Sequence, residues 1–299
     1  MTNVTLVDFS QTVVAAVAVE AKDVKEGDTK NLIKHIALNI LLNIKSKFGK
    51  NIILCCDSKN YWRKKEFQYY KGHRKLIKEK SDYMDWTMVG EVMTEIKKEL
   101  LESFPYMLLE VDGAEADDII AVLCKYYQTN EMNSEGLFEV PKEILIYSSD
   151  NDFVSLQKYK NVKQWHNPCK KFVTCDNPRE YLIEKICVGD GGDNIPSIPN
   201  PDAWSQCRTE GIPVRAKSFM KTRLPDFYRR GIDACENKAE RKAYERNIML
   251  IDFDSIPKYI EDSILDAYKN HKILGNKNTV YKYLVSHRMK LLIQYASNF

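Results

Sequence analysis

The chain has 299 residues and a formal net charge of +3, with 44% hydrophobic and 29% charged residues. This composition provides a sizeable core, and the small net charge excludes a generically basic protein that coats nucleic acid. The sequence has no long apolar run and no signal-peptide pattern, which excludes a membrane-spanning or secreted protein. The eight cysteines contain no C-x-x-C pair, which predicts reduced thiols in a cytoplasmic protein rather than a disulfide framework or a zinc knuckle.

Short apolar runs alternate with helical periodicities in the first half of the chain. The runs predicted to be buried strands are Val4–Phe9, Asn51–Cys56, Met107–Val111 and Ile144–Tyr147. Asn31–Phe48 and Glu115–Tyr127 carry apolar residues at helical spacing, and Gly49 ends the first of these helices. Strand–helix alternation of this kind predicts an α/β fold with a central, mostly parallel sheet flanked by helices.

The character of the chain changes after Trp165. Asn161–Trp165 and Lys171–Thr174 are expected to be short strands at the sheet edge, and Asn130–Glu139 is expected to be a polar surface loop. From Pro178 the pattern is helical, apart from the proline-rich stretch Ile195–Pro201. We therefore divide the chain into an α/β domain, residues 1–177, and a helical domain, residues 178–299.

Acidic residues follow the predicted strands. In an open α/β sheet the carboxyl ends of the strands share one crevice, so acids placed there converge. The acids in question are Asp8, Asp57, Glu115, Asp117, Asp118, Asp150, Asp152, Asp190 and Asp193. So many ionised carboxylates repel one another unless a divalent cation lies among them, and all-oxygen ligands favour magnesium or manganese over zinc. Because paired ions of this kind promote attack on a phosphodiester, the pattern predicts a metal-dependent nuclease.

Each acidic motif also has a simpler interpretation. Glu115-x-Asp117-Asp118 opens a predicted helix, where acids interact with the helix dipole, and Asp190–Asn194 contains the glycines of a turn. Asp150-x-Asp152 after a strand also fits an aspartyl phosphatase, in which the first Asp is a nucleophile. The phosphatase interpretation leaves the other acids unexplained and ranks below the nuclease.

A basic segment, Lys59–Lys80, follows Asp57. Its cations and interleaved aromatic residues are Lys59, Tyr61, Trp62, Arg63, Lys64, Lys65, Phe67, Tyr69, Tyr70, Lys71, Arg74, Lys75, Lys78 and Lys80. Cations neutralise phosphates and aromatic rings stack on unpaired bases, so this mixture suits a single strand better than a duplex. An isolated charge run is usually a solvated helix, but the position of this one beside an expected metal ligand favours nucleic-acid binding.

These motifs together resemble the 5′-nuclease superfamily of flap endonucleases, most closely its bacteriophage ribonuclease H branch. The segments that carry the resemblance span nearly the whole chain in order: Leu6–Gln11, Ile53–Asp57, Tyr61–Arg63, Tyr69–Lys71, Glu115–Asp118, Ser148–Phe153, Lys163–Trp165, Gly189–Asn194 and Leu250–Asp254. The resemblance implies a PIN-like 5′-nuclease fold with a helical arch at about residues 58–90 and a helical C-terminal part that binds DNA.

The resemblance also implies roles for single residues. The acids listed above would hold two Mg²⁺ ions, for which Mn²⁺ can substitute, with Asp118 and Asp190 acting in the second shell or through water. Lys71 and Arg74 would be the catalytic cations that reach the scissile phosphate from the arch. The expected nucleic-acid contacts are Arg63, Lys64, Tyr70, Lys75, Lys217 and Lys221. Tyr70 would stack on the terminal base, and Gly189–Lys221 would be a helix–three-turn–helix element that grips duplex DNA.

The implied activity is that of a 5′→3′ exonuclease and flap endonuclease. It would act as a monomer on branched or nicked DNA and on RNA/DNA hybrids with a 5′ end, and would remove RNA primers during lagging-strand replication in an infected bacterium. The tail Asn276–Phe299 either contacts a single-stranded-DNA-binding protein or is only the terminal helix of the fold. The alternatives are a PIN-type RNA endonuclease, which typically has fewer acids and no basic arch, and a non-catalytic binder, which would have lost its ligands.

Two departures from the family pattern bear on the nucleic-acid interface. The segment Ile195–Arg215 contains prolines and is expected to be irregular, where relatives carry a glycine-rich hairpin. Gly72 lies inside the expected arch helix, at a cost of about 1 kcal/mol relative to alanine, so the arch is expected to be partly unfolded without DNA.

Overall fold

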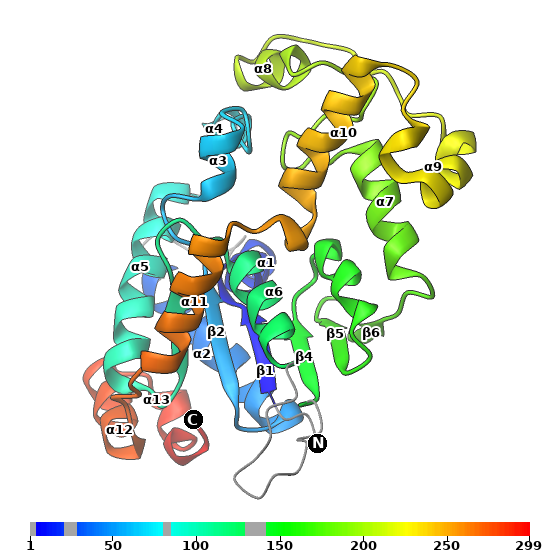
Figure 1. Ribbon diagram of the computed structural model, residues 1–299. Helices are drawn as coiled ribbons and strands as arrows, with labels where there is room; N and C mark the ends of the chain where they lie inside the picture. Colours follow the sequence, from blue (N-terminus) through cyan, green and yellow to red (C-terminus); the bar gives the residue numbers. More distant parts are fainter. Residues whose placement is uncertain (1–3, 21–28, 80–84, 129–141) are drawn as a thin grey trace, which may run out of the picture.

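The computed structural model describes residues 4–20, 29–79, 85–128 and 142–299. Within these residues a six-stranded sheet has the order β3-β2-β1-β4-β5-β6 (Figure 1). Its strands are β1 (Val4–Asp8), β2 (Ile52–Cys56), β3 (Met107–Glu110), β4 (Ile144–Tyr147), β5 (Val162–His166) and β6 (Lys171–Val173). All neighbouring strands are parallel except β5 and β6. The mostly parallel sheet predicted from the sequence is confirmed, and the expected loop Asn130–Glu139 lies outside the described residues.

Alternating side chains divide the sheet between two cores. In β2, Ile52, Leu54 and Cys56 enter one core, whereas Ile53 and Cys55 enter the other. The helices α1 (Phe9–Glu20), α2 (Thr29–Phe48) and α5 (Trp86–Ser103) cover the first face, and α6 (Ala116–Tyr126) and α11 (Lys258–Asn270) cover the second. Sequence analysis missed α1, because residues 13–19 are uniformly apolar and give no polar face from which a helical period could be recognised.

A third core holds the helical part together. It lies between α7 (Pro178–Val188), α9 (Leu224–Arg230) and α10 (Lys238–Ile251), and it includes Phe67 and Tyr70 from the base of the arch. The chain is helical from Pro178, as expected. The segment Ile195–Arg215, expected to be irregular, contains a further helix, α8 (Ala203–Thr209). The 3₁₀ helices are η1 (Asn151–Lys158), η2 (Lys221–Arg223), η3 (Gly231–Ala234), η4 (Phe253–Ser255) and η5 (Ala296–Asn298).

The arch region consists of two short helices, α3 (Trp62–Glu66) and α4 (Arg74–Glu79), and residues 80–84 lie outside the described part of the chain. The expectation that Gly72 interrupts a helix is wrong, because Gly72 lies in the turns between α3 and α4. A Cβ at this position would lie 2.6 Å from the Oγ1 of Thr209 in α8. Glycine is therefore required by the close approach of the arch to α8.

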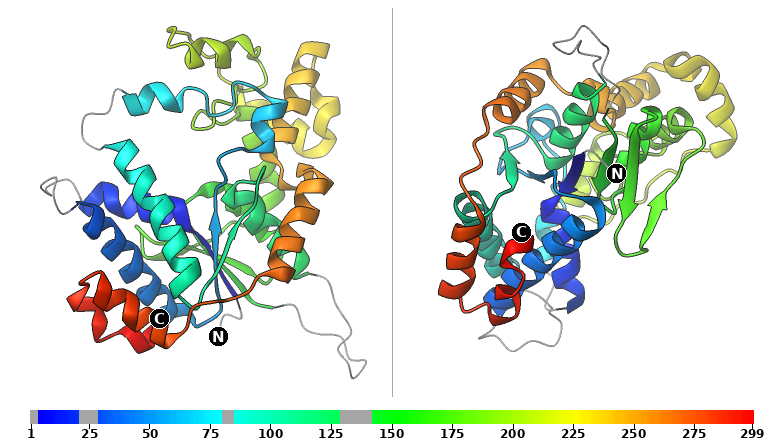
Figure 2. Two further views of the ribbon diagram at one scale, coloured as in Figure 1. Left: turned by 90° about the vertical axis from the view of Figure 1, so that its left-hand side faces the viewer. Right: turned by 90° about the horizontal axis from the view of Figure 1, so that it is seen from below.

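The C-terminal helices α12 (Lys277–Ser286) and α13 (Lys290–Ile293) lie beside α2 and α5 (Figure 2). Val280, Leu284 and Phe299 are buried in the same core as α2 and α5. The rings of Phe104 and Phe299 are 5.2 Å apart, centroid to centroid. The tail is thus a structural part of the α/β body. No helix in the described ranges is long and apolar enough to cross a membrane.

Candidate metal centre and nucleic-acid interface

The ends of three parallel strands bring acidic side chains to one edge of the sheet. Asp8 is the last residue of β1, Asp57 directly follows β2, and Asp150 follows β4. Asp117 lies in the first turn of α6, which begins six residues after β3 ends. The Oγ of Ser148 donates a hydrogen bond of 3.1 Å to Asp8, and the Asp57 carboxylate accepts one of 2.9 Å from the backbone N–H of Ala116.

These carboxylates carry charge that the protein does not neutralise. Within the described ranges, Asp8, Asp57, Asp117 and Asp150 form no ion pair with a lysine or arginine. Burial and then the carboxylates of Asp57 and Asp150 raise the pKa of Asp8 to about 7. Burial and then Asp8 and Asp150 raise the pKa of Asp117 well above its usual value. Burial also raises the pKa of Asp150, although Lys185 opposes this shift.

This donor set fits a hard divalent cation. All the available ligand atoms are carboxylate oxygens, which suit Mg²⁺ or Mn²⁺, and a cation among them would favour the ionised forms that burial and repulsion oppose. In the present conformation no three acidic, histidine or cysteine side chains of the described residues form a ready-made ion-binding group. Ligation would therefore need the side chains to turn toward a common ion.

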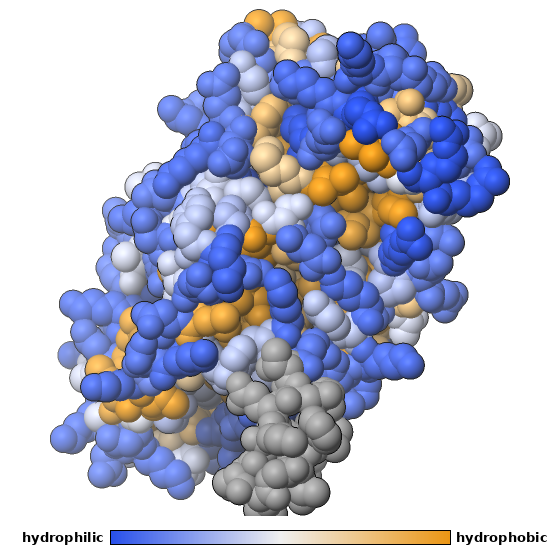
Figure 3. Space-filling model, viewed as in Figure 1, coloured by the Kyte–Doolittle hydropathy of each residue, from blue (hydrophilic) through white to orange (hydrophobic). Residues whose placement is uncertain are grey.

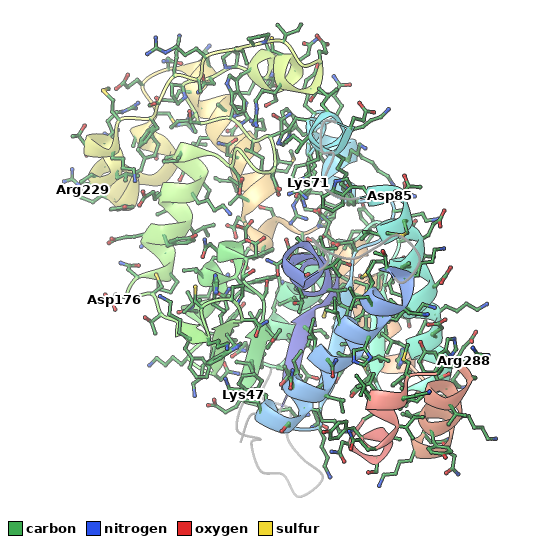
Figure 4. All side chains as sticks on the ribbon, turned by 180° about the vertical axis from the view of Figure 1, so that it is seen from behind. Lys47, Lys71, Asp85, Asp176, Arg229 and Arg288 are labelled. Carbon is green, nitrogen blue, oxygen red and sulfur yellow. The ribbon has the colours of Figure 1, made fainter. Side chains whose placement is uncertain are left out.

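The remaining expected ligands are already paired with cations. The Nζ of Lys71 lies 2.5 Å from Glu115 and 3.6 Å from Asp193, and Arg74 lies 2.6 Å from Asp193. Burial alone would raise the pKa of Asp193, but Lys71 and Arg74 lower it below its usual value. The pairing of the arch cations with these acids brings the arch base to the metal centre; Figure 4 labels Lys71.

Lys71 and Arg74, which the resemblance implies reach the scissile phosphate from the arch, contact Glu115 and Asp193 in the structure. Lys71 has a φ of 54°, and its backbone N–H donates a hydrogen bond of 2.9 Å to the carbonyl of Asp193. This local conformation directs the ammonium group back toward the carboxylates. The catalytic roles of the two residues remain predictions.

Asp118, which was expected to act indirectly, and two expected nucleic-acid contacts, Arg63 and Tyr70, lie inside the protein. Asp118 is fully buried, lies 2.8 Å from Arg63, accepts a hydrogen bond from Trp62 and caps α6 through the N–H of Glu115. It therefore cannot reach a metal ion directly. Arg63 is only 3% exposed because Glu115 and Asp118 hold it inside, so the expected nucleic-acid contact is wrong for this conformation.

Tyr70 is likewise buried, and no face of its ring is available for stacking on a base. Its hydroxyl lies 3.0 Å from Glu115 and 2.8 Å from Asp193, between the two acids. Both the burial and the hydrogen bonds fix the arch base against the metal centre. The expected stacking of Tyr70 on a terminal base is therefore also wrong for this conformation.

The other expected nucleic-acid contacts lie on the surface. Lys64 and Lys75 are exposed on α3 and α4, and Lys217 is exposed in the extended segment after α8. Lys221 is also exposed and forms an ion pair of 2.7 Å with Glu184. Their positions permit phosphate contacts, which remain predictions.

Sequence analysis missed two residues of the site. Lys185, in the last turn of α7, contacts Asp152 and lies 3.1 Å from Asp190. Asn194 is fully buried with a φ of 64°, and its side chain donates hydrogen bonds of 2.9 Å to the carbonyls of Tyr69 and Ser205. The position of Asn194 beside Asp193 was the available sequence clue, whereas the role of Lys185 depends on how α7 packs against η1.

Comparisons with known proteins match this chain over nearly its whole length. The model of the 5′-3′ exonuclease N-terminal resolvase-like domain matches residues 3–186, and that of the T4 RNase H C-terminal domain matches residues 178–299. The ribonuclease H of Enterobacteria phage T4 is 33% identical over 304 residues, covering 98% of this chain and 95% of the relative. A 5′-3′ exonuclease of Buchnera aphidicola is 27% identical over 54% of each chain.

Solved structures share the fold. Bacteriophage T5 5′-exonuclease with bound zinc has a TM-score of 0.58 at 16% identity, covering 89% of this chain and 98% of its own. T5 D15 flap endonuclease, in a pseudo-enzyme-product complex with DNA and metal ions, has a TM-score of 0.61 at 15% identity with the same coverage.

Proposed function

This chain belongs to the 5′-3′ exonuclease family, with a C-terminal domain of the T4 RNase H type, and from that premise we propose that it is a divalent-metal-dependent, structure-specific 5′ nuclease. The observation that carries the proposal is the cluster of carboxylates at the ends of β1, β2 and β4, of which Asp8 is buried and Asp57 and Asp150 are half-buried; none of them pairs with a cation among the described residues, and the cations of the arch lie beside them. More specifically, we propose that the protein is a 5′→3′ exonuclease and flap endonuclease that acts on RNA/DNA and DNA/DNA duplexes.

We also propose a biological role, the removal of RNA primers during lagging-strand replication in the cytoplasm of an infected bacterium. The similarity of nearly the whole chain to the ribonuclease H of Enterobacteria phage T4 supports this role. The ion is Mg²⁺, with Mn²⁺ able to substitute, because the donor set is entirely oxygen. One T5 neighbour holds zinc and the other holds DNA and metal ions, which supports a divalent-metal cofactor and a DNA substrate.

In the proposed mechanism, Asp8, Asp57, Asp117 and Asp150 hold the metal ions, together with Asp152 and Asp193. The bound ions would supply an activated water and neutralise charge on the phosphate. Lys71 and Arg74 bind and orient the scissile phosphate, since their present partners are carboxylates that metal binding would neutralise. A fixed cation beside the phosphate stabilises charge that develops in the transition state.

A product-length assay tests the proposal. Flap, nicked and RNA-primed duplexes with a 5′ label are incubated with Mg²⁺, with Mn²⁺ or with EDTA. We expect short 5′ products with either metal and none with EDTA. Binding of these substrates without cleavage would indicate a non-catalytic nucleic-acid-binding protein. Cleavage of single-stranded RNA that does not require a 5′ end would favour the PIN-type RNA endonuclease.

We further propose that the C-terminal region contacts a single-stranded-DNA-binding protein through the outer face of α12. Tyr281 and Val285 are about half exposed there, with Lys282 between them, and Figure 3 shows hydrophobic surface over this part of the molecule. The core-facing side of α12 is already used in packing. Tyr281→Ala with Val285→Ala should abolish stimulation by the cognate binder without loss of folding, whereas unchanged stimulation would contradict the contact.

A further inference from the structure

A groove lies between the end of α2 and the C-terminal tail, at the opposite end of the sheet from the acid cluster. Its volume is about 970 Å³. We name it the tail groove, and its lining residues are Asn39, Leu42, Asn43, Lys45, Ser46, Lys50, Pro105, Gly275, Asn276, Lys277, Tyr295, Ser297, Asn298 and Phe299. Lys50 precedes β2 and Pro105 precedes β3, whereas the acids follow their strands. Figure 4 shows the same separation between Lys47, near the end of α2, and Lys71.

The tail groove has positive charge and no acidic side chain in its lining. Among the described residues, no carboxylate forms an ion pair with Lys45, Lys50 or Lys277. Burial, and then the charges of Lys50 and Lys277, lower the pKa of Lys45. Three ammonium groups without counter-ions in one concave surface attract an anionic ligand.

A neighbouring cavity has a different charge pattern. That cavity is also lined by residues of α12, but it contains Glu95, Glu99 and Glu102 beside Lys98 and Lys282. The lysines of this cavity therefore have carboxylates nearby: the Nζ of Lys98 lies 3.9 Å from the carboxylate of Glu102. The lysines of the tail groove have no such neighbours in its lining.

The other lining residues suit a peptide. Asn39, Leu42, Asn43 and Ser46 follow a helical spacing that places them on one face of α2. Amide and hydroxyl groups both donate and accept hydrogen bonds, as a peptide backbone does. Leu42, Pro105 and the partly exposed ring of Tyr295 offer apolar contact, and the volume is at the upper end of that of small-ligand pockets, too large for a single small anion.

We propose that the tail groove binds an acidic, extended segment of a partner protein, with carboxylates on Lys45, Lys50 and Lys277 and an apolar side chain against Leu42 and Tyr295. Nucleic acid fits less well. The five residues of β2 alone separate the groove from the metal centre by roughly 16 Å. Tyr295 is the single exposed aromatic residue in the lining, so successive bases would lack stacking partners. This inference does not depend on the proposed nuclease activity.

Fluorescence anisotropy with the full chain tests the proposal. The probe is a labelled peptide of aspartate and glutamate with one central phenylalanine, compared with a peptide that has asparagine and glutamine at the acidic positions and with an oligothymidylate of equal length. We expect saturable binding of the acidic peptide alone. Lys50→Glu and Lys277→Glu should each raise its Kd at least about tenfold, which is the scale of losing one close charge pair. The matched control, Lys98→Glu, should change it less than about twofold.

Exchanging the charges between protein and peptide tests more strictly whether Lys50 and Lys277 bind the acidic residues of the peptide. The double variant Lys50→Glu/Lys277→Glu should bind a peptide in which lysine replaces each acid, and the parent should not. Thermal unfolding of each variant, together with Lys50→Gln and Lys277→Gln, separates loss of binding from loss of folding. Equal affinity of the acidic peptide for the parent and both reversed variants would overturn the proposal. So would an oligothymidylate that binds with the same sensitivity to Lys50 and Lys277, because the groove would then be a nucleic-acid site.

Discussion

At the scale of single residues, the metal centre divides into two sets of acids. Asp8, Asp57, Asp117 and Asp150 have no cationic partner among the described residues, whereas Glu115, Asp152, Asp190 and Asp193 are paired with Lys71, Arg74 or Lys185. The carboxylates of the first set repel one another, so a bound metal ion would stabilise their ionised forms more than those of the second set. The second set holds the arch and α7 against the site.

Asp150→Asn should cut turnover of a flap substrate by at least about 100-fold, because loss of a ligand weakens the electrostatic stabilisation that the metal ion supplies. Flap binding should persist, since phosphate contacts elsewhere are unchanged. Single-turnover rates and a filter-binding assay measure the two effects. Asp176→Asn, at an exposed acid away from the centre (Figure 4), is the control. Near-parent turnover by Asp150→Asn at low Mg²⁺ would refute the cluster assignment.

The pKa of Asp8 gives a pH prediction for the metal-free protein. Its folded-state pKa is raised from 3.8 to about 7, so its contribution to stability is present below its usual pKa and is lost as the pH rises toward 7. Asp8→Asn should therefore gain stability relative to the parent between pH 4 and pH 7. Added Mg²⁺ should stabilise the parent more at pH 8 than at pH 6, because protons compete for the carboxylates. Thermal unfolding measures both trends, and a parent–variant difference that is constant with pH would contradict them.

At the scale of elements, the arch base is defined by what it touches. Tyr70, Lys71 and Arg74 contact the acids of the metal centre, whereas Lys78 in α4 contacts no acid among the described residues and lies 5.3 Å from the ring of Trp86. The inner end of the arch region, at residues 70–74, thus faces the metal centre. Its outer end, at Lys78, is suited to binding a nucleic-acid strand.

Lys71→Ala and Arg74→Ala should lower the single-turnover rate more than the affinity, because a cation beside the phosphate acts mainly in the transition state. Lys78→Ala should weaken affinity and its salt dependence instead. Rates at saturating enzyme and titrations at two salt concentrations separate these effects. Equal, affinity-only losses in all three variants would reduce the segment to a generic basic patch.

The contact between the arch and α8 gives a prediction of its own. Gly72→Ala should loosen this contact and lower flap cleavage, because the new Cβ would lie within 3 Å of both the Oγ1 and the Cγ2 of Thr209. Thr209→Ala removes both atoms, so the double variant should recover activity. A double-mutant cycle on single-turnover rate measures the coupling. Additive effects would mean that Gly72 and Thr209 do not interact.

At the scale of the whole molecule, the C-terminal helices complete the core on the first face of the sheet. Leu284 is fully buried there, whereas Leu291 is 70% exposed on the next helix. Leu284→Ala should reduce the free energy of unfolding by about 2–5 kcal/mol, and Leu291→Ala should change it by less than about 0.5 kcal/mol. Denaturant unfolding measures both. Deletion of residues 280–299 should unfold the protein, so similar stability of the truncated and full chains would contradict this packing.

The sequence by itself determined the sheet, the strand ends and the acids that follow them, because apolar runs and the positions of charged residues are local and parallel strands place their carboxyl ends at one edge. It also showed a basic segment directly after Asp57, but the contacts of Lys71 and Arg74 with Glu115 and Asp193 come from the structure. Only the tertiary structure decided which acids remain unpaired, since Lys185 and Arg63 reach their partners from elements distant in sequence.

The difference between local sequence and long-range packing also explains which sequence-based expectations were wrong. The resemblance implied that Arg63 and Tyr70 contact nucleic acid, but hydrogen bonds to Glu115 hold both side chains inside. Gly72 was expected within a helix, but it lies in a turn that α8 approaches closely. The tail could not be assigned from its sequence, because helical spacing does not say which body a helix packs against. Long-range packing decided these points, and it depends on how separate elements meet rather than on any one segment.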